Sequence, residues 1–130
     1  MKTRLASDIP SAGTMTARGV ARMYSALLGH VRGVALVSPG RLAAMAAVAF
    51  TGMDQVMGFP VRWAFGYAPD RPGAAASRPG STFGMVGANG SAAYADIDSG
   101  VAVAVMRNRF AAGDLTTAAR IDKIVARTLA

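Results

Sequence analysis

The chain has 130 residues, 52% of them hydrophobic, and a formal net charge of +7. This length suits one domain, and the hydrophobic content excludes intrinsic disorder, which requires low hydrophobicity together with high net charge. Cysteine is absent and His30 is the only histidine. Disulfides, a thiolate nucleophile and a metal site built from these residue types are therefore not expected. We expect no metal and no cofactor.

The basic residues are spread along the whole sequence. Only Arg107 and Arg109 form a close pair. Nucleic-acid binding driven by counterion release needs clustered cations. The charge therefore favours a solvated basic surface and no nucleic-acid partner.

The sequence contains no candidate membrane segment. The first residues, MKTRLASDIPSAG, include no apolar signal stretch, and the longest uncharged apolar run, Leu42–Met53, is too short to cross a bilayer. A cytoplasmic protein that does not bind membranes is predicted.

Two helices are predicted before residue 50. After an extended start at Ile9-Pro10, Thr14 or Thr16 can cap the first helix. Ser38-Pro39 is a cap followed by a first-turn proline, and it predicts a second helix through about Ala49. The apolar stripe of the first helix, at helical spacing, contains Val20, Met23, Tyr24, Leu27 and Leu28.

Residues 51–80 show three sequence patterns in turn, which predict a loop, a strand and a second loop. Residues 51–60 are interrupted by glycine and proline and predict a loop. From residue 61 the pattern has a period of two, typical of a half-buried strand. Ala68–Gly80 holds three of the six prolines and no large apolar residue, so it predicts a surface loop. The inward-facing side chains of the strand would be Val61, Trp63, Phe65 and Tyr67.

Further strands are predicted over Thr82–Val86 and from Ser91 to about Asp96, with a bend at Gly87–Gly90 between them. Ile97–Gly100 supplies polar turn residues that end in glycine, as a hairpin needs. Val101–Met106 is a continuous apolar run, which suits a strand covered on both faces.

A last helix completes the chain. Asp114, Thr116 or Thr117 can cap it. The sum is an α+β fold, with an antiparallel sheet of three to four strands packed with helices in one domain spanning residues 1–130. The helical part covers about 9–50, the strands about 61–109 and the last helix about 115–129. The inner face of this helix would be Ala118, Ile121, Ile124, Val125 and Leu129.

The segment GMVGANGS, residues 84–91, has three glycines within seven residues, which let a backbone turn sharply or come close to a ligand. On composition alone, an ordinary strand end is the better interpretation. The order of PSAGTMTARGVARMYSALLG, LVSPGRLAAM and FGMVGANGSAAYADIDSGVAVAVMRNRF, however, resembles the C-terminal part of the serine β-lactamase-like family. That family contains class C β-lactamases, penicillin-binding proteins and esterases. The resemblance covers about residues 9–130 and the last third of a typical member.

Two motifs carry the resemblance. The later stretch is similar to the family's third active-site motif and the hairpin after it. That motif is Lys-Thr-Gly in the lactamases and often His-x-Gly in the esterases, and it falls on Met85, Val86 and Gly87. The resemblance implies a partial β-lactamase/transpeptidase-like fold. The first stretch is similar to the family's P-x-x-G…T-A-x-x-(L/V)-A-R helix, matched by Pro10, Gly13, Thr16, Ala17, Ala21 and Arg22.

The resemblance also implies a role for one backbone amide. In the family, the residue after the motif's glycine gives an N–H to the oxyanion hole, which here would be Ala88. Such a donor stabilises the tetrahedral intermediate formed when a serine attacks an ester or amide carbonyl, and losing one costs about 10²–10³ in rate. The glycine would leave room for the substrate, a small acyl ester or a β-lactam.

The chain departs from the family pattern where the reactive groups are expected. Met85 stands in place of a lysine or histidine, and neither Lys2 nor Lys123 has the serine three residues earlier that Ser-x-x-Lys requires. No tyrosine begins a Tyr-x-Asn or Tyr-x-Ser motif. We therefore expect no catalytic residue in this chain and no acylation chemistry by the chain alone.

Other polar residues have simpler explanations. His30 is better explained as a residue of a helix C-terminus than as a general base. Asp96 and Asp98 are better explained as turn residues than as a carboxylate pair. The aromatic residues of the strand, Trp63, Phe65 and Tyr67, could line a substrate cleft, but core packing is commoner, and it is also the expected role of Met23, Met45, Met53 and Met57.

The sequence thus predicts the C-terminal portion of a β-lactamase-like serine hydrolase, which in full length would cleave an ester or amide through an acyl-serine. Two alternatives stay open. The chain is half of a split hydrolase and pairs with an N-terminal half of the same fold, or it is a non-catalytic interaction module. In the family, N-terminal strands complete the sheet, so Val101–Met106 is expected to expose unpaired amides and to favour self-association.

Overall fold

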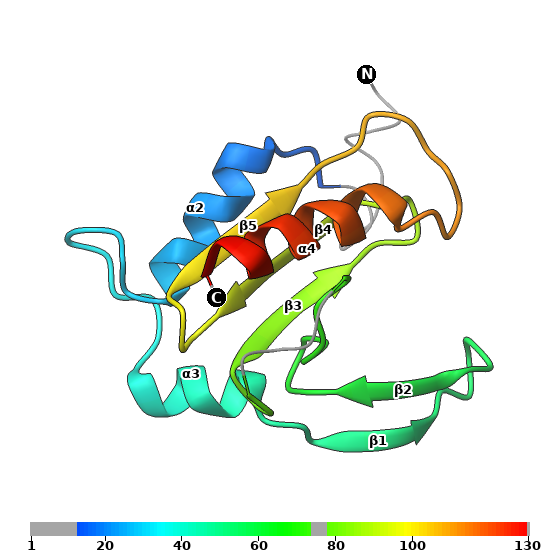
Figure 1. Ribbon diagram of the computed structural model, residues 1–130. Helices are drawn as coiled ribbons and strands as arrows, with labels where there is room; N and C mark the ends of the chain where they lie inside the picture. The colour runs from blue at the N-terminus through cyan, green and yellow to red at the C-terminus, as the bar shows by residue number, and fades with distance from the viewer. Residues whose placement is uncertain (1–12, 74–77, 130) are drawn as a thin grey trace.

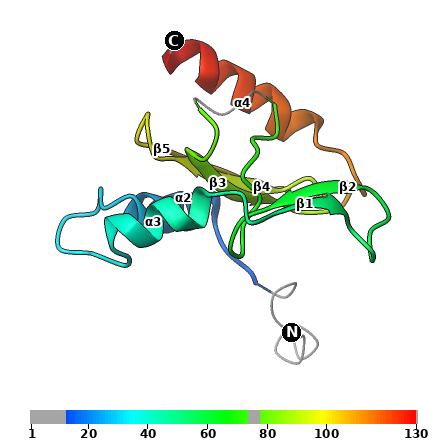
Figure 2. The same cartoon turned by 90° about the horizontal axis from the view of Figure 1, so that it is seen from below.

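The computed structural model describes residues 13–73 and 78–129. The extended start predicted at Ile9-Pro10 lies outside these residues. A central antiparallel sheet has α2 (Ala17–Leu27) and α3 (Pro39–Ala46) on one face and α4 (Thr116–Leu129) on the other, as Figures 1 and 2 show from two directions. The predicted α+β class is confirmed. None of these helices combines the length and the apolar character needed to cross a bilayer.

The strands form two sheets. In the larger one, β4 (Ala92–Asp96) lies between β3 (Thr82–Val86) and β5 (Val101–Val105), and both pairings are antiparallel. In the smaller one, β1 (Phe50–Met53) pairs with β2 (Pro60–Trp63). A single bridge between Ala68 and Gly84 joins the chain after β2 to the outer edge of β3 (Figure 1). The three strands predicted between residues 82 and 106 are confirmed.

The fifth strand differs from the prediction in its burial. Every residue of β4 is buried, whereas every residue of β5 is half-buried. In the part of the chain that the structure describes, β5 pairs only with β4, so its other edge carries no strand. Since side chains on both faces of β5 are half-buried, the predicted cover of both faces is partial in the described residues.

The first helix begins as predicted. The Thr16 side chain accepts a hydrogen bond from the Gly19 amide at 3.1 Å, which satisfies one of the free N–H groups of the first turn. Val20 and Tyr24 are buried against the sheet, but Met23, also assigned to the stripe, is 43% exposed. The Tyr24 ring lies 5.8 Å from the ring of Phe83, a fully buried residue of β3. Burial raises the pKa of Tyr24 to about 12.

The prediction that residues 51–60 form a loop is wrong for residues 51–53, which belong to β1. The second helix ends at Ala46 and not near Ala49, because Ala47 is extended and the Ala49 amide donates to the Trp63 carbonyl at 2.8 Å. The strand predicted from residue 61 ends early at Trp63. The chain then turns, since the Ala64 amide donates to the Tyr67 carbonyl at 2.8 Å around Gly66, whose φ is +79°.

This turn reorients the aromatic residues that follow β2. Phe65, predicted to face inward, is 70% exposed. Tyr67 packs on the core, with its ring 5.3 Å from that of Phe83 and 6.3 Å from that of Tyr24. The three rings approach one another edge-on or tilted, which is the favourable geometry for aromatic pairs.

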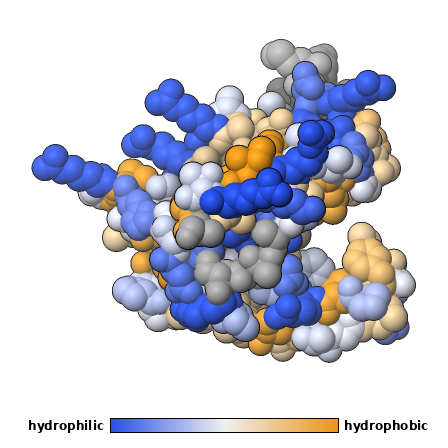
Figure 3. Space-filling view, in the orientation of Figure 1, coloured by the Kyte–Doolittle hydropathy of each residue, from blue (hydrophilic) through white to orange (hydrophobic). Residues whose placement is uncertain are grey.

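The last helix buries only part of the predicted face: Ala118 is buried and Ile121 and Val125 are half-buried. Ala118 and Asp122 are buried, whereas Ile124 is 62% and Leu129 is 46% exposed. Figure 3 shows apolar atoms in the open among long hydrophilic side chains on the face that carries α4. A buried carboxylate, and not the apolar stripe, therefore turns α4 toward the sheet.

Asp122 is buried because its carboxylate pairs with the guanidinium of Arg71. Arg71 belongs to Ala68–Gly80, the segment that was predicted to be a surface loop. The Arg71 side chain is only 4% exposed, and its guanidinium nitrogen lies 2.6 Å from Asp122 Oδ1. The Gly73 amide donates to Asp122 Oδ2 at 3.0 Å, and the Tyr94 hydroxyl donates to Asp122 Oδ1. Arg71 also lies 3.7 Å from Asp96 Oδ2 and 5.0 Å from the centre of the Tyr94 ring. We name Arg71, Tyr94, Asp96 and Asp122 the buried charge cluster.

Two consequences follow from this cluster. Burial, with the nearby Asp122 carboxylate, raises the pKa of Tyr94, so its hydroxyl stays a donor. Gly73 passes so close to α4 that a Cβ there would lie 2.2 Å from the Ala119 carbonyl oxygen. The cluster and this close approach fix α4 to the loop and to β4.

Replacing Asp122 by alanine should lower the free energy of unfolding by about 3–5 kcal/mol, because it leaves the buried Arg71 guanidinium without its main counter-charge. Urea unfolding followed by far-UV circular dichroism measures this loss. Asp70→Ala is the matched control, since Asp70 pairs with Arg62 at 2.9 Å in the open and the loss there should be at most about 1 kcal/mol. Equal losses for the two variants would contradict the structural role of the cluster.

Candidate functional site

The bend between β3 and β4 is held by its own hydrogen bonds. The Gly87 amide donates to the Ser91 carbonyl at 2.8 Å, and the Gly90 amide donates to the Gly87 carbonyl at 2.9 Å. Gly90 has φ +84°, and a Cβ there would lie 2.3 Å from the Asp114 carbonyl oxygen. Glycine is thus required at residue 90 by both conformation and space.

Ala88 lies at the exposed tip of this bend. Its carbonyl accepts a hydrogen bond from the Gly113 amide at 2.9 Å. Its own amide makes no hydrogen bond to another described residue. The backbone is therefore held at the carbonyl side while one N–H stays available to a ligand.

Beside this amide lies an open cleft of about 460 Å³. Four segments contribute to its walls: residues 85–88, the loop and strand at residues 57–63, Ala68 and Asp70 after β2, and Gly113 and Leu115 before α4. Most of the lining is apolar, which is usual for sites that take small organic molecules. The largest apolar side chains in the lining are Met57, Phe59, Trp63, Met85 and Leu115.

One ion pair borders this cleft among the residues that the structure describes. Arg62 and Asp70 are the charged residues in that part of the lining, and their side chains are 2.9 Å apart. Each compensates the other's charge, so the wall presents no unpaired cation. Within residues 13–73 and 78–129, the lining also contains no serine, threonine, tyrosine, lysine or histidine. The cleft by itself therefore has a hydrogen-bond donor but no nucleophile.

The walls are fixed by carboxylates that accept backbone hydrogen bonds. Asp54 accepts the amides of Met57 and Val56, each at 2.8 Å, and these bonds lower its pKa. Asp114 accepts the Thr116 amide and the Arg107 guanidinium. Hydrogen bonds from Thr116, followed by those from Arg107, hold the pKa of Asp114 down at about 2. Both carboxylates thus stay ionised at neutral pH.

The residues of the predicted third motif come together at the cleft. Met85 is 41% exposed, and Val86 and Gly87 continue the same wall as far as Ala88. A Cβ at Gly87 would lie 2.9 Å from Asn89 Oδ1, so the turn itself also favours glycine. Trp63 lines the cleft as well, unlike Phe65. No sequence pattern predicts a role for Phe59 or Leu115, because the walls converge from segments far apart along the chain.

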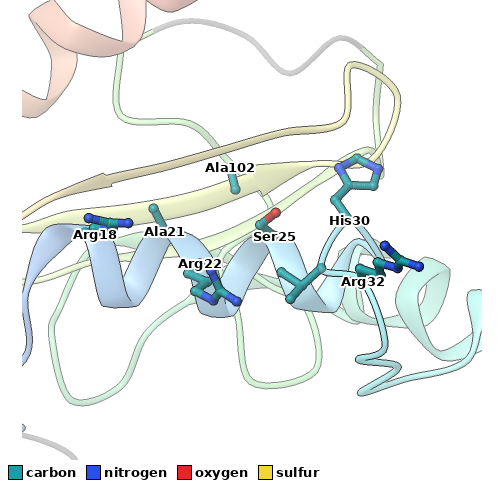
Figure 4. Close-up of a pocket in the computed structure, with 8 residues that line it drawn as sticks. Arg18, Ala21, Arg22, Ser25, His30, Arg32 and Ala102 are labelled. Atoms are coloured by element: carbon teal, nitrogen blue, oxygen red, sulfur yellow. The ribbon is translucent and has the colours of Figure 1, made fainter.

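The other polar candidates lie outside the cleft lining. His30 stands beside the turn between β4 and β5, where a Cβ on Gly100 would approach its ring to 2.8 Å (Figure 4). Asp96 belongs to the buried charge cluster and accepts the Asp98 amide at 3.0 Å, and Asp98 pairs with Arg78 at 2.7 Å. Asp96 thus accepts the turn hydrogen bond that was expected, whereas the Asp98 carboxylate forms an ion pair.

Comparisons with known proteins identify the family. The β-lactamase family model matches residues 3–127. None of the curated proteins compared matches the chain. Among solved structures, EstA from Arthrobacter nitroguajacolicus Rue61a superposes with a TM-score of 0.64 at 18% sequence identity, over 88% of this chain and 33% of EstA. The chain thus spans about a third of the length of EstA and shares its fold over that part. Since the family model covers nearly all of its residues, the chain belongs to the β-lactamase family.

Proposed function

We propose that these residues form the C-terminal portion of a β-lactamase-like serine hydrolase. They contribute the apolar wall of the substrate cleft and one backbone amide of the oxyanion hole, that of Ala88. The attacking serine and its base come from polypeptide outside these residues. The observation that supports this assignment is the free Ala88 amide at an apolar cleft that contains no nucleophile.

The reaction proceeds in two steps. The serine oxygen attacks the carbonyl carbon, the carbonyl oxygen becomes an oxyanion, and the intermediate collapses to an acyl-serine as the alcohol or amine leaves. Water then attacks the acyl-serine and releases the acid. The Ala88 N–H donates to the oxyanion in both steps, and it costs no reorganisation because the bend is already held by its hydrogen bonds.

The substrate is an uncharged ester with an apolar group. A cationic side chain at residue 85 would attract a substrate carboxylate, and the chain has methionine there. Arg62, the one cation among the described lining residues, is neutralised by Asp70. Both features favour neutral esters over the carboxylate-bearing β-lactams, which are the second candidate substrate.

The missing part of the site is supplied in one of two ways. It belongs to the same polypeptide, or it is a separate N-terminal half that pairs with the open edge of β5. The open edge favours association in either case, because unpaired strand amides promote pairing with another chain. If the chain were instead a purely non-catalytic interaction module, its cleft would bind no substrate.

Ligand binding in the cleft can be measured through Trp63, which is the only tryptophan. We expect 4-nitroanisole, a neutral nitroaromatic, to quench its fluorescence more strongly than 4-nitrobenzoate does at equal millimolar concentration. Met85→Lys should raise the affinity for 4-nitrobenzoate up to about fivefold, since an exposed ion pair contributes up to about 1 kcal/mol.

Met23→Lys is the matched control, because Met23 is 43% exposed, Met85 is 41% exposed, and Met23 lies on α2, outside the cleft lining. If Met23→Lys changes 4-nitrobenzoate binding as much as Met85→Lys does, the effect comes from the net charge and residue 85 does not select the substrate.

Catalysis should depend on the Ala88 amide. The chain alone should give no burst of p-nitrophenol from p-nitrophenyl butyrate. Together with the polypeptide that carries Ser-x-x-Lys and Tyr-x-Asn, it should give a burst of one equivalent per complex. Replacing the Ala88 amide bond by an ester through semisynthesis should reduce the rate of acylation about 10²–10³-fold.

The same replacement at the Ala112 amide is a control for the effect of semisynthesis. The Trp63 titration reports whether the cleft still binds its ligand. A burst from the chain alone, or an unchanged rate after the replacement at Ala88, would contradict the proposed function.

A further inference from the structure

Two peptide groups, one before and one after the Cα of Ala88, set the direction of the Ala88 N–H. In a trans peptide group the C=O and N–H bonds point to opposite sides. The Gly87 carbonyl accepts a hydrogen bond from the Gly90 amide at 2.9 Å, so the Ala88 N–H, which shares that peptide group, points away from Gly90. The next peptide group is held by the bond from the Gly113 amide to the Ala88 carbonyl at 2.9 Å. The direction of the donor therefore depends on how firmly Gly90 and Gly113 are held.

Arg107, the second residue after β5, contacts both of these anchor points. Its Nη1 donates to the Asp114 carbonyl at 2.8 Å and to Asp114 Oδ2 at 2.9 Å, which fixes the residue that follows Gly113. The same nitrogen packs against Gly90, since a Cβ there would approach it to 2.5 Å. The guanidinium thus fills the space between the bend and the segment that precedes α4.

The backbone of Arg107 holds the far end of the bend. Its amide donates to Ser91 Oγ at 3.0 Å, and the Ser91 amide donates to Asn89 Oδ1 at 3.0 Å. The Ser91 carbonyl accepts the Gly87 amide at 2.8 Å. One residue therefore holds the bend at its end through the backbone and against α4 through the side chain.

Asp114 carries this constraint into α4. Its Oδ1 accepts the Thr116 amide at 3.0 Å, while its Oδ2 accepts the Arg107 guanidinium. The Arg107 side chain is 18% exposed and that of Asp114 is 39% exposed, so the pair is partly shielded from water. Neither residue lines the cleft, so neither would touch a substrate. We name these two residues the Arg107–Asp114 clamp.

We propose that Arg107 is the positioning residue of the oxyanion donor: through Asp114 and Gly90 it fixes the direction of the Ala88 N–H before the substrate binds. This inference rests on the proposed hydrolase function and deepens it. A hydrogen bond between ionised groups suits the task, because it is shorter and stronger than one between neutral groups. A donor held in place beforehand needs no reorganisation when the oxyanion forms.

The order of the Ala88 amide in the ¹⁵N-labelled chain measures this role. We expect an order parameter of about 0.85 in the unaltered chain, typical of a rigid backbone, and a value below about 0.6 in Arg107→Met, which has no donor. Arg107→Lys should restore most of the order, because its ammonium keeps the charge and can donate to Asp114. The amides of Phe83 and Tyr94 in the sheet should stay rigid in both variants.

A difference between the effects on binding and on rate separates positioning from a general loosening of the cleft. Arg107→Met should change the affinity for 4-nitroanisole, read from Trp63 fluorescence, by less than about twofold, since the clamp lies outside the lining. In the completed hydrolase the same variant should slow acylation by p-nitrophenyl butyrate up to about 10²-fold, because a displacement of about 1 Å can cost that much. Arg107→Lys should recover most of this rate.

Arg78→Met is the matched control. Arg78 also pairs with an aspartate, Asp98 at 2.7 Å, and lies outside the cleft lining. This variant should leave the Ala88 order parameter and the acylation rate unchanged. Circular dichroism checks that each variant is folded. If Arg107→Met does not fold, Asp114→Asn provides the test, since it removes the charge of the acceptor and should also lower the order of the Ala88 amide.

Three results would overturn the proposal. They are a rigid Ala88 amide in the folded clamp variants, an equal loss of order in Arg78→Met, and parallel losses of 4-nitroanisole binding and acylation in Arg107→Met. Failure of the proposed function gives a different result, which is the absence of a burst from the unaltered chain in the completed hydrolase. The order parameters would still decide whether Arg107 holds the bend.

Discussion

The buried charge cluster is the constraint on which the rest of the molecule depends. Asp122 on α4 meets Arg71, which follows β2, and Tyr94 in the centre of the sheet. Each of these elements leads to one part of the cleft. Asp70, next to Arg71, holds Arg62 on β2, and Leu115 precedes α4 by one residue. A contact that is remote from the cleft thus keeps two of its walls in place against the bend at Ala88.

Local patterns in the sequence predicted the sheet well and the helix faces less well. Glycine turns bound the strands β3 and β4, and Thr16 is a strong N-cap for α2. Short stretches of sequence are therefore enough to predict these three elements. The strand β1 has no alternating pattern and exists because Ala49 and its neighbours pair with β2. Asp122 in a helix is typical of a solvated face, and its partner Arg71 is 51 residues away. No local pattern could have joined these two residues.

The candidate site was predictable only in part, for a related reason. The resemblance to a family motif led to residues 85–88, and the structure adds that the Ala88 carbonyl is held by Gly113 while its amide is free. A backbone donor leaves little trace in side-chain identity. The rest of the cleft depends on Met57, Phe59 and Leu115, whose positions follow from the packing of the β1–β2 hairpin and of α4 around the bend.

The described part of the chain has two kinds of surface that a self-sufficient domain usually avoids. Among the described strands, β5 is paired on one edge only. Ile124 and Leu129 of α4 are exposed, and Figure 3 shows apolar atoms in the open on the face that carries this helix. Exposed strand edges and apolar patches favour association. In the described residues the cleft lining holds no nucleophile and β5 has a neighbour on one edge only. The proposed hydrolase accounts for both features at once, since the polypeptide that carries the serine and its base would also pair with β5.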